Sequence, residues 1–274
     1  MEKIVSTGAK GGVGKSTFAI LLAFKLSNQR KKVVLCDCDV ECPNDYLILG
    51  KKLKDKKPIY KEYPILDKKK CIKCGKCSET CKYNAVFWVK EKYPIFIYDL
   101  CSSCKACVIA CPSKAIKTKK QIAGNSHINK INDNFWLVTG ISKPGVLDIV
   151  PIVREAKERA IELAKEKNAI YLIIDTAPGT HCNVIQALLN SDRVYAVTEP
   201  TPLGSHDLGL ILELVKKLNI PTEIVLNKAD VGNRKEIENI AKKFNKKISV
   251  EIPYSEKLVK AYCNKKLEKV VNLI

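Results

Sequence analysis

Eight of the thirteen cysteines stand in two runs with the same spacing, CIKCGKCSETC and CSSCKACVIAC. Both runs have the pattern C-x2-C-x2-C-x3-C, with which protein loops bind [4Fe–4S] clusters. Three thiolates separated by two residues wrap around one cluster, and the fourth begins a segment that leads away and so binds the other cluster. The spacing therefore predicts two [4Fe–4S] clusters, the first bound by Cys71, Cys74, Cys77 and Cys111 and the second by Cys101, Cys104, Cys107 and Cys81.

The two runs are copies of one unit. Their cysteines repeat at an offset of 30 residues, and Ala85-Val86 recurs as Ala115-Ile116. A match of this length at a fixed offset indicates a duplication. Pro112 follows the last cysteine of the second run whereas Lys82 follows that of the first, so we expect a less constrained backbone turn at Lys82.

Zinc and disulfides are the alternative uses of so many cysteines. Tetrahedral zinc has little use for four cysteines in each run. Disulfides are disfavoured because the chain begins MEKIVSTG, without a signal-peptide layout, and no apolar run reaches the ~18 residues of a membrane span. We therefore expect a cytoplasmic protein without membrane association, whose thiols are reduced and serve metals or catalysis.

A second stretch, GAKGGVGKST at residues 8–17, has the composition of a phosphate-binding loop. It follows a short apolar run and precedes FAILLAFKL, so it would connect a strand to a helix whose N-terminus favours phosphate. Gly11, Gly12 and Gly14 let the backbone approach the phosphates, Lys15 reaches the outer ones, and the Ser16 hydroxyl can bind Mg²⁺. These residues predict an ATP and Mg²⁺ site.

Two acidic strand ends accompany this loop. LIIDTAPG places Asp175 after four apolar residues, where a carboxylate can hold Mg²⁺ through water. VVLCDCD ends in Asp37 and Asp39, one of which could orient the attacking water. A turn or helix-capping role is the alternative for each residue alone, but their combination with the loop favours a catalytic role.

The distribution of apolar segments predicts the fold class and the domains. Strands and helices alternate over residues 1–50 and again from about residue 131, which indicates an α/β domain with a doubly wound parallel sheet. The lysine-rich residues 51–70 read as an exposed connector to the cysteine-rich part. We therefore expect one discontinuous domain, 1–50 and 131–274, with an inserted module at 51–130.

The loop sequence also resembles a known family. Its residues match the deviant Walker A signature of the MinD/ParA/Mrp class of P-loop ATPases, and the resemblance covers the chain apart from the insert: Lys10, Gly11, Gly12, Val13, Gly14, Lys15 and Ser16. With its insert, the chain resembles members of that class that carry a bacterial-type 2[4Fe–4S] ferredoxin domain, which implies a small α+β module.

The resemblance assigns further roles. It implies that Lys10 reaches across a two-fold interface to the phosphates bound by the other subunit, so that ATP holds a homodimer together. It also implies that Asp39 positions water, that Thr17 meets the inner phosphate and that Asn227 contacts adenine. A solvated loop lysine is the alternative for Lys10.

The remaining features are less specific. The formal net charge of +19 comes almost entirely from lysines spread along the chain, which indicates a solvated surface rather than a nucleic-acid site. Cys182 stands seven residues after Asp175, an offset that resembles that of a bridging-cluster ligand in the nitrogenase iron protein of the same class, so a further cluster between subunits and an ordinary thiol are both open. A further metal is also open for Cys36, Cys38 and Cys42. The aromatic residues between the cysteine runs and the C-terminal amphipathic segment are expected to pack into the core.

Three functions remain open. The first is an ATP hydrolase whose nucleotide-dependent dimer couples ATP turnover to electron transfer between an unknown redox donor and acceptor. The second is an ATP-gated iron–sulfur cluster carrier or scaffold, and the third is ParA-like DNA partitioning. Permanent four-cysteine sites favour the first, because carriers use exposed cysteines shared at a dimer face.

Overall fold

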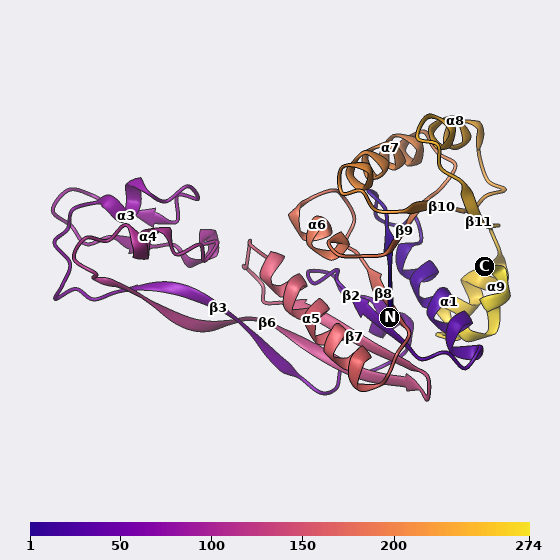
Figure 1. Ribbon diagram of the computed structural model, residues 1–274, viewed down its shortest axis with the longest axis horizontal. Helices are drawn as coiled ribbons and strands as arrows, with labels where there is room; N and C mark the ends of the chain where they lie inside the picture. The colour runs from indigo at the N-terminus through magenta and orange to yellow at the C-terminus, as the bar shows by residue number, and fades with distance from the viewer. The chain divides into compact units, whose positions relative to one another are not determined.

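The computed structural model describes all 274 residues, which divide into two compact units (Figure 1). The first unit comprises Met1–Lys57, Ser126–Ile141 and Val153–Ile274, and the second comprises Pro58–Asn125 and Ser142–Ile152. The inserted segment expected at 51–130 overlaps the second unit without coinciding with it, since 142–152 also belongs there.

The first unit is built on a parallel sheet, as predicted. Its parallel strands are β1 (Glu2–Thr7), β2 (Val33–Asp37), β7 (Phe135–Ser142), β8 (Tyr171–Asp175), β9 (Arg193–Thr198), β10 (Thr222–Asn227) and β11 (Ile248–Ile252). The full sheet also contains β3 (Lys57–Leu66) and β6 (Ile116–Asn132), in the order β11-β10-β9-β1-β8-β2-β7-β6-β3. The central strands are buried on both faces, as their continuous apolar runs require.

Helices cover both faces of this sheet (Figure 1). They are α1 (Lys15–Asn28), α2 (Asp45–Ile48), α5 (Val150–Glu166), α6 (Cys182–Leu188), α7 (Pro202–Lys217), α8 (Lys235–Lys243) and α9 (Glu256–Cys263), with a 3-10 segment η2 (Leu267–Leu273). The connection from β1 to β2 runs in the opposite direction along the sheet to those that follow β7, so right-handed crossovers place α1 opposite the α5–α8 group. The C-terminal α9 and η2 pack on α1, as expected for that segment.

The chain passes between the two units through β3 and β6, and the expectation of an exposed connector at 51–70 was wrong for this part. Residues 57–66 form a strand in which Ile59, Lys61 and Tyr63 are buried at alternate positions. Lysine at one inward position concealed this alternation, because buried lysine is rare unless it is paired. Lys61 is paired: its Nζ lies 3.0 Å from Oδ2 of Asp148.

The second unit contains short elements around the cysteines. They are α3 (Lys76–Glu79), β4 (Val86–Phe87), β5 (Ile95–Phe96), η1 (Tyr98–Leu100) and α4 (Ala106–Ile109), with β4 and β5 antiparallel. Its small core consists of Cys77, Val86, Cys107 and Ile116. None of the helices combines the length and the apolar composition that a membrane span requires.

Candidate functional site

Two of the acidic residues predicted for nucleotide chemistry, Asp37 and Asp175, lie side by side at the carboxyl ends of neighbouring strands. Ser6 of β1 pairs in register with Asp175 of β8, which pairs with Asp37 of β2, which in turn pairs with Thr139 of β7. The connections after β1 and β8 leave toward opposite faces of the sheet, and such a switch point is where open α/β sheets bind ligands.

The loop between β1 and α1 has the close backbone packing that a phosphate cradle needs. Gly14 has φ 101°, and a Cβ there would collide with the side chain of Asn227. Gly8 is equally constrained, because its Cβ would lie 2.6 Å from the carbonyl oxygen of Val197. Glycine is therefore required at both ends of the loop.

The loop side chains fit a magnesium nucleotide. Lys15 is buried and its Nζ donates to the backbone oxygen of Lys10 at 3.0 Å, while the Ser16 hydroxyl donates to Oδ2 of Asp175 at 2.6 Å. Burial lowers the pKa of Lys15, and the nearby Asp175 and Asp39 oppose this. Burial raises the pKa of Asp175 to about 7 against the Ser16 hydrogen bond and Lys15. A bound Mg²⁺ would favour the charged carboxylate.

Lys10 is held within its own chain. Its Nζ lies 2.9 Å from Oε1 of Glu199, whose other oxygen lies 2.9 Å from Nζ of Lys228. Glu199 is 7% exposed, and hydrogen bonds from the two lysines lower its pKa although burial acts in the opposite direction. No sequence motif indicates Glu199, and its only signal is its position directly after the apolar strand β9.

The other predicted nucleotide residues lie around the loop. Asn227 donates from Nδ2 to the backbone oxygen of Val13 at 2.9 Å, so the structure places it as a support for the loop. Thr17 is half-buried in the first turn of α1. Asp39 is half-buried, and burial raises its pKa although Lys15 acts in the opposite direction. The roles toward adenine, phosphate and water stay predictions.

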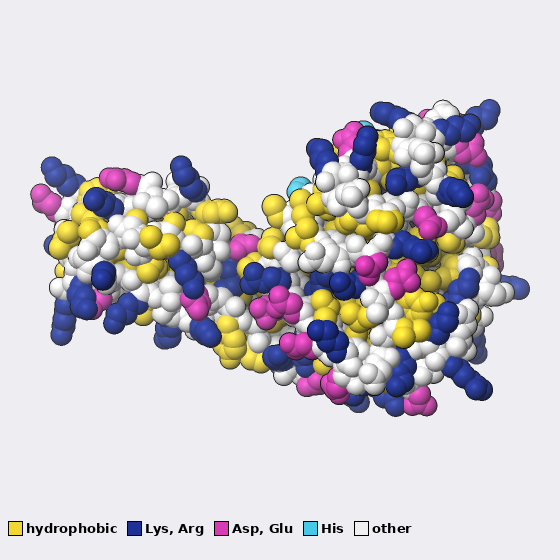
Figure 2. All heavy atoms as spheres, in the orientation of Figure 1, with side chains coloured by type: hydrophobic (Ala, Val, Ile, Leu, Met, Phe, Trp, Pro, Cys, Tyr) yellow, Lys and Arg dark blue, Asp and Glu magenta, His cyan; other side chains and the backbone are white.

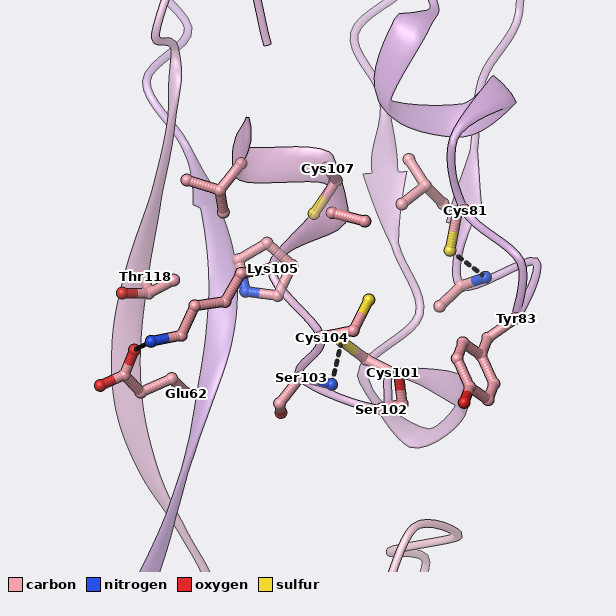
Figure 3. Close-up of a pocket in the computed structure, with 15 residues that line it drawn as sticks. Glu62, Cys81, Tyr83, Cys101, Ser102, Ser103, Cys104, Lys105, Cys107 and Thr118 are labelled. Atoms are coloured by element: carbon pink, nitrogen blue, oxygen red, sulfur yellow. Dashed lines mark hydrogen bonds and ion pairs between the residues drawn. The ribbon is translucent and has the colours of Figure 1, made fainter. Parts of the chain in front are cut away.

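The cysteines of the second unit form two groups, and each group lines its own cavity. One cavity is lined by Cys101, Cys104, Cys107 and Cys81, whose side chains are drawn around it in Figure 3. The other cavity is lined by Cys71, Cys74, Cys77 and Cys111. These are the two crossed groups that the spacing predicts, so the arrangement fits two clusters that exchange their fourth ligand.

The internal repeat extends to the backbone. Positive φ angles occur at the equivalent positions Lys73 and Ser103, Gly75 and Lys105, and Asn84 and Lys114. Asn84 and Lys114 both have φ 51°, so the turn after Cys81 has the same form as the turn after Cys111, which contains Pro112. The turn beyond Lys82 thus adopts its left-handed form without the proline, and the weaker constraint expected there stays a prediction.

Backbone N–H groups point at equivalent sulfurs in both copies. Lys73 and Ser103 donate to the Sγ atoms of Cys71 and Cys101 at 3.4 Å, and Ala85 and Ala115 donate to those of Cys81 and Cys111 at 3.3 and 3.2 Å. Such hydrogen bonds stabilise thiolate and adjust cluster potentials.

Burial of the inner cysteines has the opposite effect from these hydrogen bonds, because it favours the protonated thiol over the thiolate. It raises the pKa of Cys77 and of Cys101, and it raises the pKa of Cys107 to about 11. Binding of a metal cluster at these positions would therefore have to displace the proton of each buried thiol.

The sequence predicts that the aromatic and other apolar residues between the two runs pack into the core over the cysteines. Only some of them do. Val86 and Phe96 join the core, Trp88 packs on Gly75, and Pro94 is buried beside the cavity of the Cys71 group. Six other side chains are exposed: Phe87, Val89, Tyr93, Ile95, Ile97 and Tyr98. A two-residue strand pair can bury only one side, so the alternate residues face solvent.

The remaining cysteines gather no common site. Cys36 and Cys38 are buried with their sulfurs 3.5 Å apart, whereas Cys42 and Cys182 are exposed.

The charged side chains follow the expected distribution. Figure 2 shows lysines and arginines over both units, interspersed with acidic groups, rather than in one basic patch on the face that it presents.

Comparison with known proteins identifies the family. Residues 4–268 match the model of the CobQ/CobB/MinD/ParA nucleotide binding domain. The chain belongs to this family, and its loop and parallel sheet are those of a P-loop ATPase.

Similar proteins connect the same chain with iron–sulfur proteins. An uncharacterized protein of Methanocaldococcus jannaschii is 40% identical over 264 residues, which are 96% of this chain and 90% of the relative. An uncharacterized ferredoxin of the same organism is 38% identical over 58 residues, 20% of this chain and 75% of the ferredoxin. An iron–sulfur cluster carrier protein of Rickettsia bellii is 28% identical over 121 residues, 43% of this chain and 37% of the carrier.

The fold has a clear structural counterpart. The crystal structure of a ParA family ATPase from Chlorobium tepidum superposes with a TM-score of 0.60 at 20% identity, over 98% of this chain and 92% of the other. With the cysteine module, these likenesses describe a nucleotide-binding P-loop ATPase that contains an iron–sulfur, ferredoxin-like module.

Proposed function

We propose that the protein is an ATP hydrolase in which a nucleotide-dependent homodimer couples ATP turnover to electron transfer through two [4Fe–4S] clusters. The single observation that carries the redox part is the arrangement of two complete cysteine groups, each of which lines a separate cavity in one chain. Four ligands from one chain suit a resident cluster, whereas a cargo cluster must be released.

The nucleotide part of the proposal assigns roles to named side chains. Lys15 would bind the outer phosphates, Ser16 would bind Mg²⁺, and Asp175 would hold that ion through water. Asp39 would orient the attacking water. When bound, the Mg-nucleotide supplies free energy by hydrolysis and each cluster stores or passes one electron.

The dimer part rests on Lys10. A cation that arrives from a second chain stabilises the transferred phosphoryl group only when the dimer closes. In the single chain the ammonium group of Lys10 is bound to Glu199, so Lys10 would have to leave Glu199 before it could act in the other subunit. Closure of the dimer and catalysis would then both depend on one movement, that of the Lys10 side chain away from Glu199.

The decisive experiment measures coupling from both directions. Under anaerobic conditions, the midpoint potentials of the clusters are determined without nucleotide, with MgADP and with a slowly hydrolysed MgATP analogue. Nucleotide affinity is then measured for oxidised and for dithionite-reduced protein. Linkage requires the two results to agree, with about 59 mV of shift for each tenfold change in affinity.

Lys15→Ala is the control, because the midpoint potentials of the clusters in this variant should no longer respond to nucleotide. Equal potentials in every nucleotide state, with equal nucleotide affinity in both redox states, would refute the coupling. Iron near eight atoms per chain is expected in anaerobically purified protein, and stoichiometric zinc in its place would refute the clusters themselves.

The partial similarity to an iron–sulfur cluster carrier protein supports a second candidate, an ATP-gated carrier. Cys74 and Cys104 are exposed, as ligands of a transferable cluster should be. The two functions differ in what leaves the protein. A carrier would lose iron to a cluster-free ferredoxin when MgATP is added, whereas the proposed electron-transfer protein would retain its iron through many turnovers.

A further inference from the structure

Behind the phosphate-binding loop lies a group of three buried carboxylates. Asp37, Asp45 and Asp175 each offer a carboxylate oxygen, and these three oxygens lie within 4.8 Å of one another. The residues are 0%, 0% and 1% exposed. Three carboxylates this close in a water-excluded place repel one another strongly unless a positive charge is shared among them.

Several oxygens of this group have no hydrogen-bond partner. They are both carboxylate oxygens of Asp45 and Oδ1 of Asp175. The hydroxyl of Thr139 is also buried and unpartnered, and Thr139 pairs in register with Asp37, so the two side chains lie on the same face of the sheet. Buried polar atoms are rarely left unpaired, and four together indicate a ligand that the protein atoms alone do not supply.

Asp37 is positioned rather than unpartnered. The backbone N–H groups of Asn44 and Asp45 donate to its Oδ2 at 3.0 and 3.1 Å, and that of Asp39 donates to its Oδ1 at 3.1 Å. This network holds the loop between β2 and α2 in place and brings Asp45 back beside the end of β2. The loop is therefore shaped to bring the third carboxylate into the group.

No positively charged group is among the strongest influences on the pKa of Asp45. Burial raises its pKa, and the groups that add most to the effect are Asp37, Asp175, Cys38 and Asp39, all of them acidic. Lys15 acts on Asp175 from the nucleotide side of the group.

We propose that Asp37, Asp45 and Asp175, with the hydroxyl of Thr139, bind a hard divalent cation in the absence of nucleotide. All the donors are oxygens, which suit Mg²⁺, Mn²⁺ or Ca²⁺ rather than a thiol-seeking metal. Ligand oxygens around Ca²⁺ lie up to about 5 Å apart, so the 4.8 Å spacing of the group fits Ca²⁺ directly. Ligand oxygens about 2.1 Å from Mg²⁺ lie up to about 4.2 Å apart, so Mg²⁺ would draw the three side chains slightly closer together.

This cation site is distinct from the Mg²⁺ site of the nucleotide. The nucleotide ion would be bound by Ser16, whose hydroxyl donates to Oδ2 of Asp175, whereas Oδ1 of Asp175 is buried without a hydrogen-bond partner and can serve the second cation. Asp175 therefore bridges the two sites. A cation in the inner site would keep Asp175 ionised and tie the segment that contains Asp39 to β8 before nucleotide arrives.

The test uses the full chain with its clusters, freed of divalent ions by chelation and kept anaerobic without nucleotide. Mn²⁺ is the probe, and its free concentration is followed by electron paramagnetic resonance. We expect one Mn²⁺ per chain, retained in Ser16→Ala, weakened at least about tenfold in Asp45→Asn and weakened less in Thr139→Val. Glu41→Gln, which removes an exposed carboxyl from the same loop, should bind as the unaltered protein does.

Competition by Mg²⁺ and Ca²⁺ then identifies the preferred ion, and thermal unfolding provides a second measurement. The same cations should raise the melting temperature of the unaltered protein and of Glu41→Gln but not that of Asp45→Asn. Failure of the unaltered protein to bind Mn²⁺ at millimolar concentration would overturn the proposal and leave a shared proton as the balance of charge. Loss of binding in Ser16→Ala, or full binding in Asp45→Asn, would overturn it equally.

Discussion

Lys10 and Glu199 are 189 positions apart in the chain, yet their side chains form an ion pair with Nζ 2.9 Å from Oε1. The lysine that the family resemblance directs to another subunit is thus retained by its own. Glu199 also binds Lys228 from the segment that contains Asn227, so one carboxylate connects two lysines beside the nucleotide loop.

Glu199→Gln should release Lys10 and favour the ATP-bound dimer. A partly buried pair is worth about 1 kcal/mol, so half-maximal dimerisation should need about fivefold less ATP. Analytical ultracentrifugation across an ATP titration measures this, with Glu213→Gln, an exposed glutamate of α7, as the matched control. Weaker dimerisation in Glu199→Gln would instead show that Glu199 supports the closed dimer.

Lys10→Ala should abolish ATP-driven dimerisation and lower hydrolysis by about a thousandfold, because a cation supplied in trans would be lost. Nucleotide affinity of the single chain should change little, since Lys15 remains. Calorimetry with ADP and a steady-state phosphate assay separate the two effects. Full hydrolytic activity in Lys10→Ala would refute its role between subunits.

Exchange of the fourth ligand can be tested with four single substitutions. Cys81→Ala and Cys104→Ala should each lose about four irons and leave the same remaining cluster, and Cys111→Ala and Cys74→Ala should leave the other. Midpoint potentials of the remaining clusters identify the pairs. If Cys81→Ala leaves the same cluster as Cys74→Ala, each run binds its own cluster without exchange.

Lys61 should affect one cluster more than the other. Its buried ammonium group contacts the backbone oxygen of Cys101 at 3.4 Å as well as Asp148, and a cation favours the more negative, reduced cluster. Lys61→Met should therefore lower the potential of the cluster in the Cys101 group by on the order of 50 mV.

The control is Lys105→Met, because Lys105 is solvent-exposed and pairs with Glu62 near the same cavity (Figure 3). Water and salt screen its charge, so a much smaller shift is expected. Equal shifts in both variants, or a shift confined to the other cluster, would contradict the assignment of Lys61.

The pH dependence of stability should also depend on Glu199. Its pKa lies below the ordinary value of 4.5, because the two lysines hold the charged form, so the native state binds fewer protons than the unfolded chain. The stabilisation is present above pH 4.5 and is lost as the pH falls through the lowered pKa. Melting temperatures should differ between the unaltered protein and Glu199→Gln at neutral pH and converge in acid, and a constant difference would contradict the assignment.

The fold and the main motifs were predictable because they depend on local spacing. The runs of apolar residues identify the strands of the parallel sheet, and the glycines of residues 8–17 identify the loop that follows β1. The β3 strand was missed because Lys61 occupies an inward position, and only its distant partner Asp148 makes that position acceptable. A sequence pattern contains no information on such a partner.

By itself the sequence determined the class of protein, a nucleotide-binding ATPase with an iron–sulfur module, since a loop of fixed covalent length can wrap a phosphate or a cluster in few ways. The tertiary structure alone decided which charges surround those ligands. The sheet order brings β8 between β1 and β2, so Asp175 lies beside both Ser16 and Asp37. The same order places the end of β9 beside the loop, so that Glu199 can pair with Lys10. Contacts of this kind join distant segments and arise only when the strands assemble, so the sequence pattern does not reveal them.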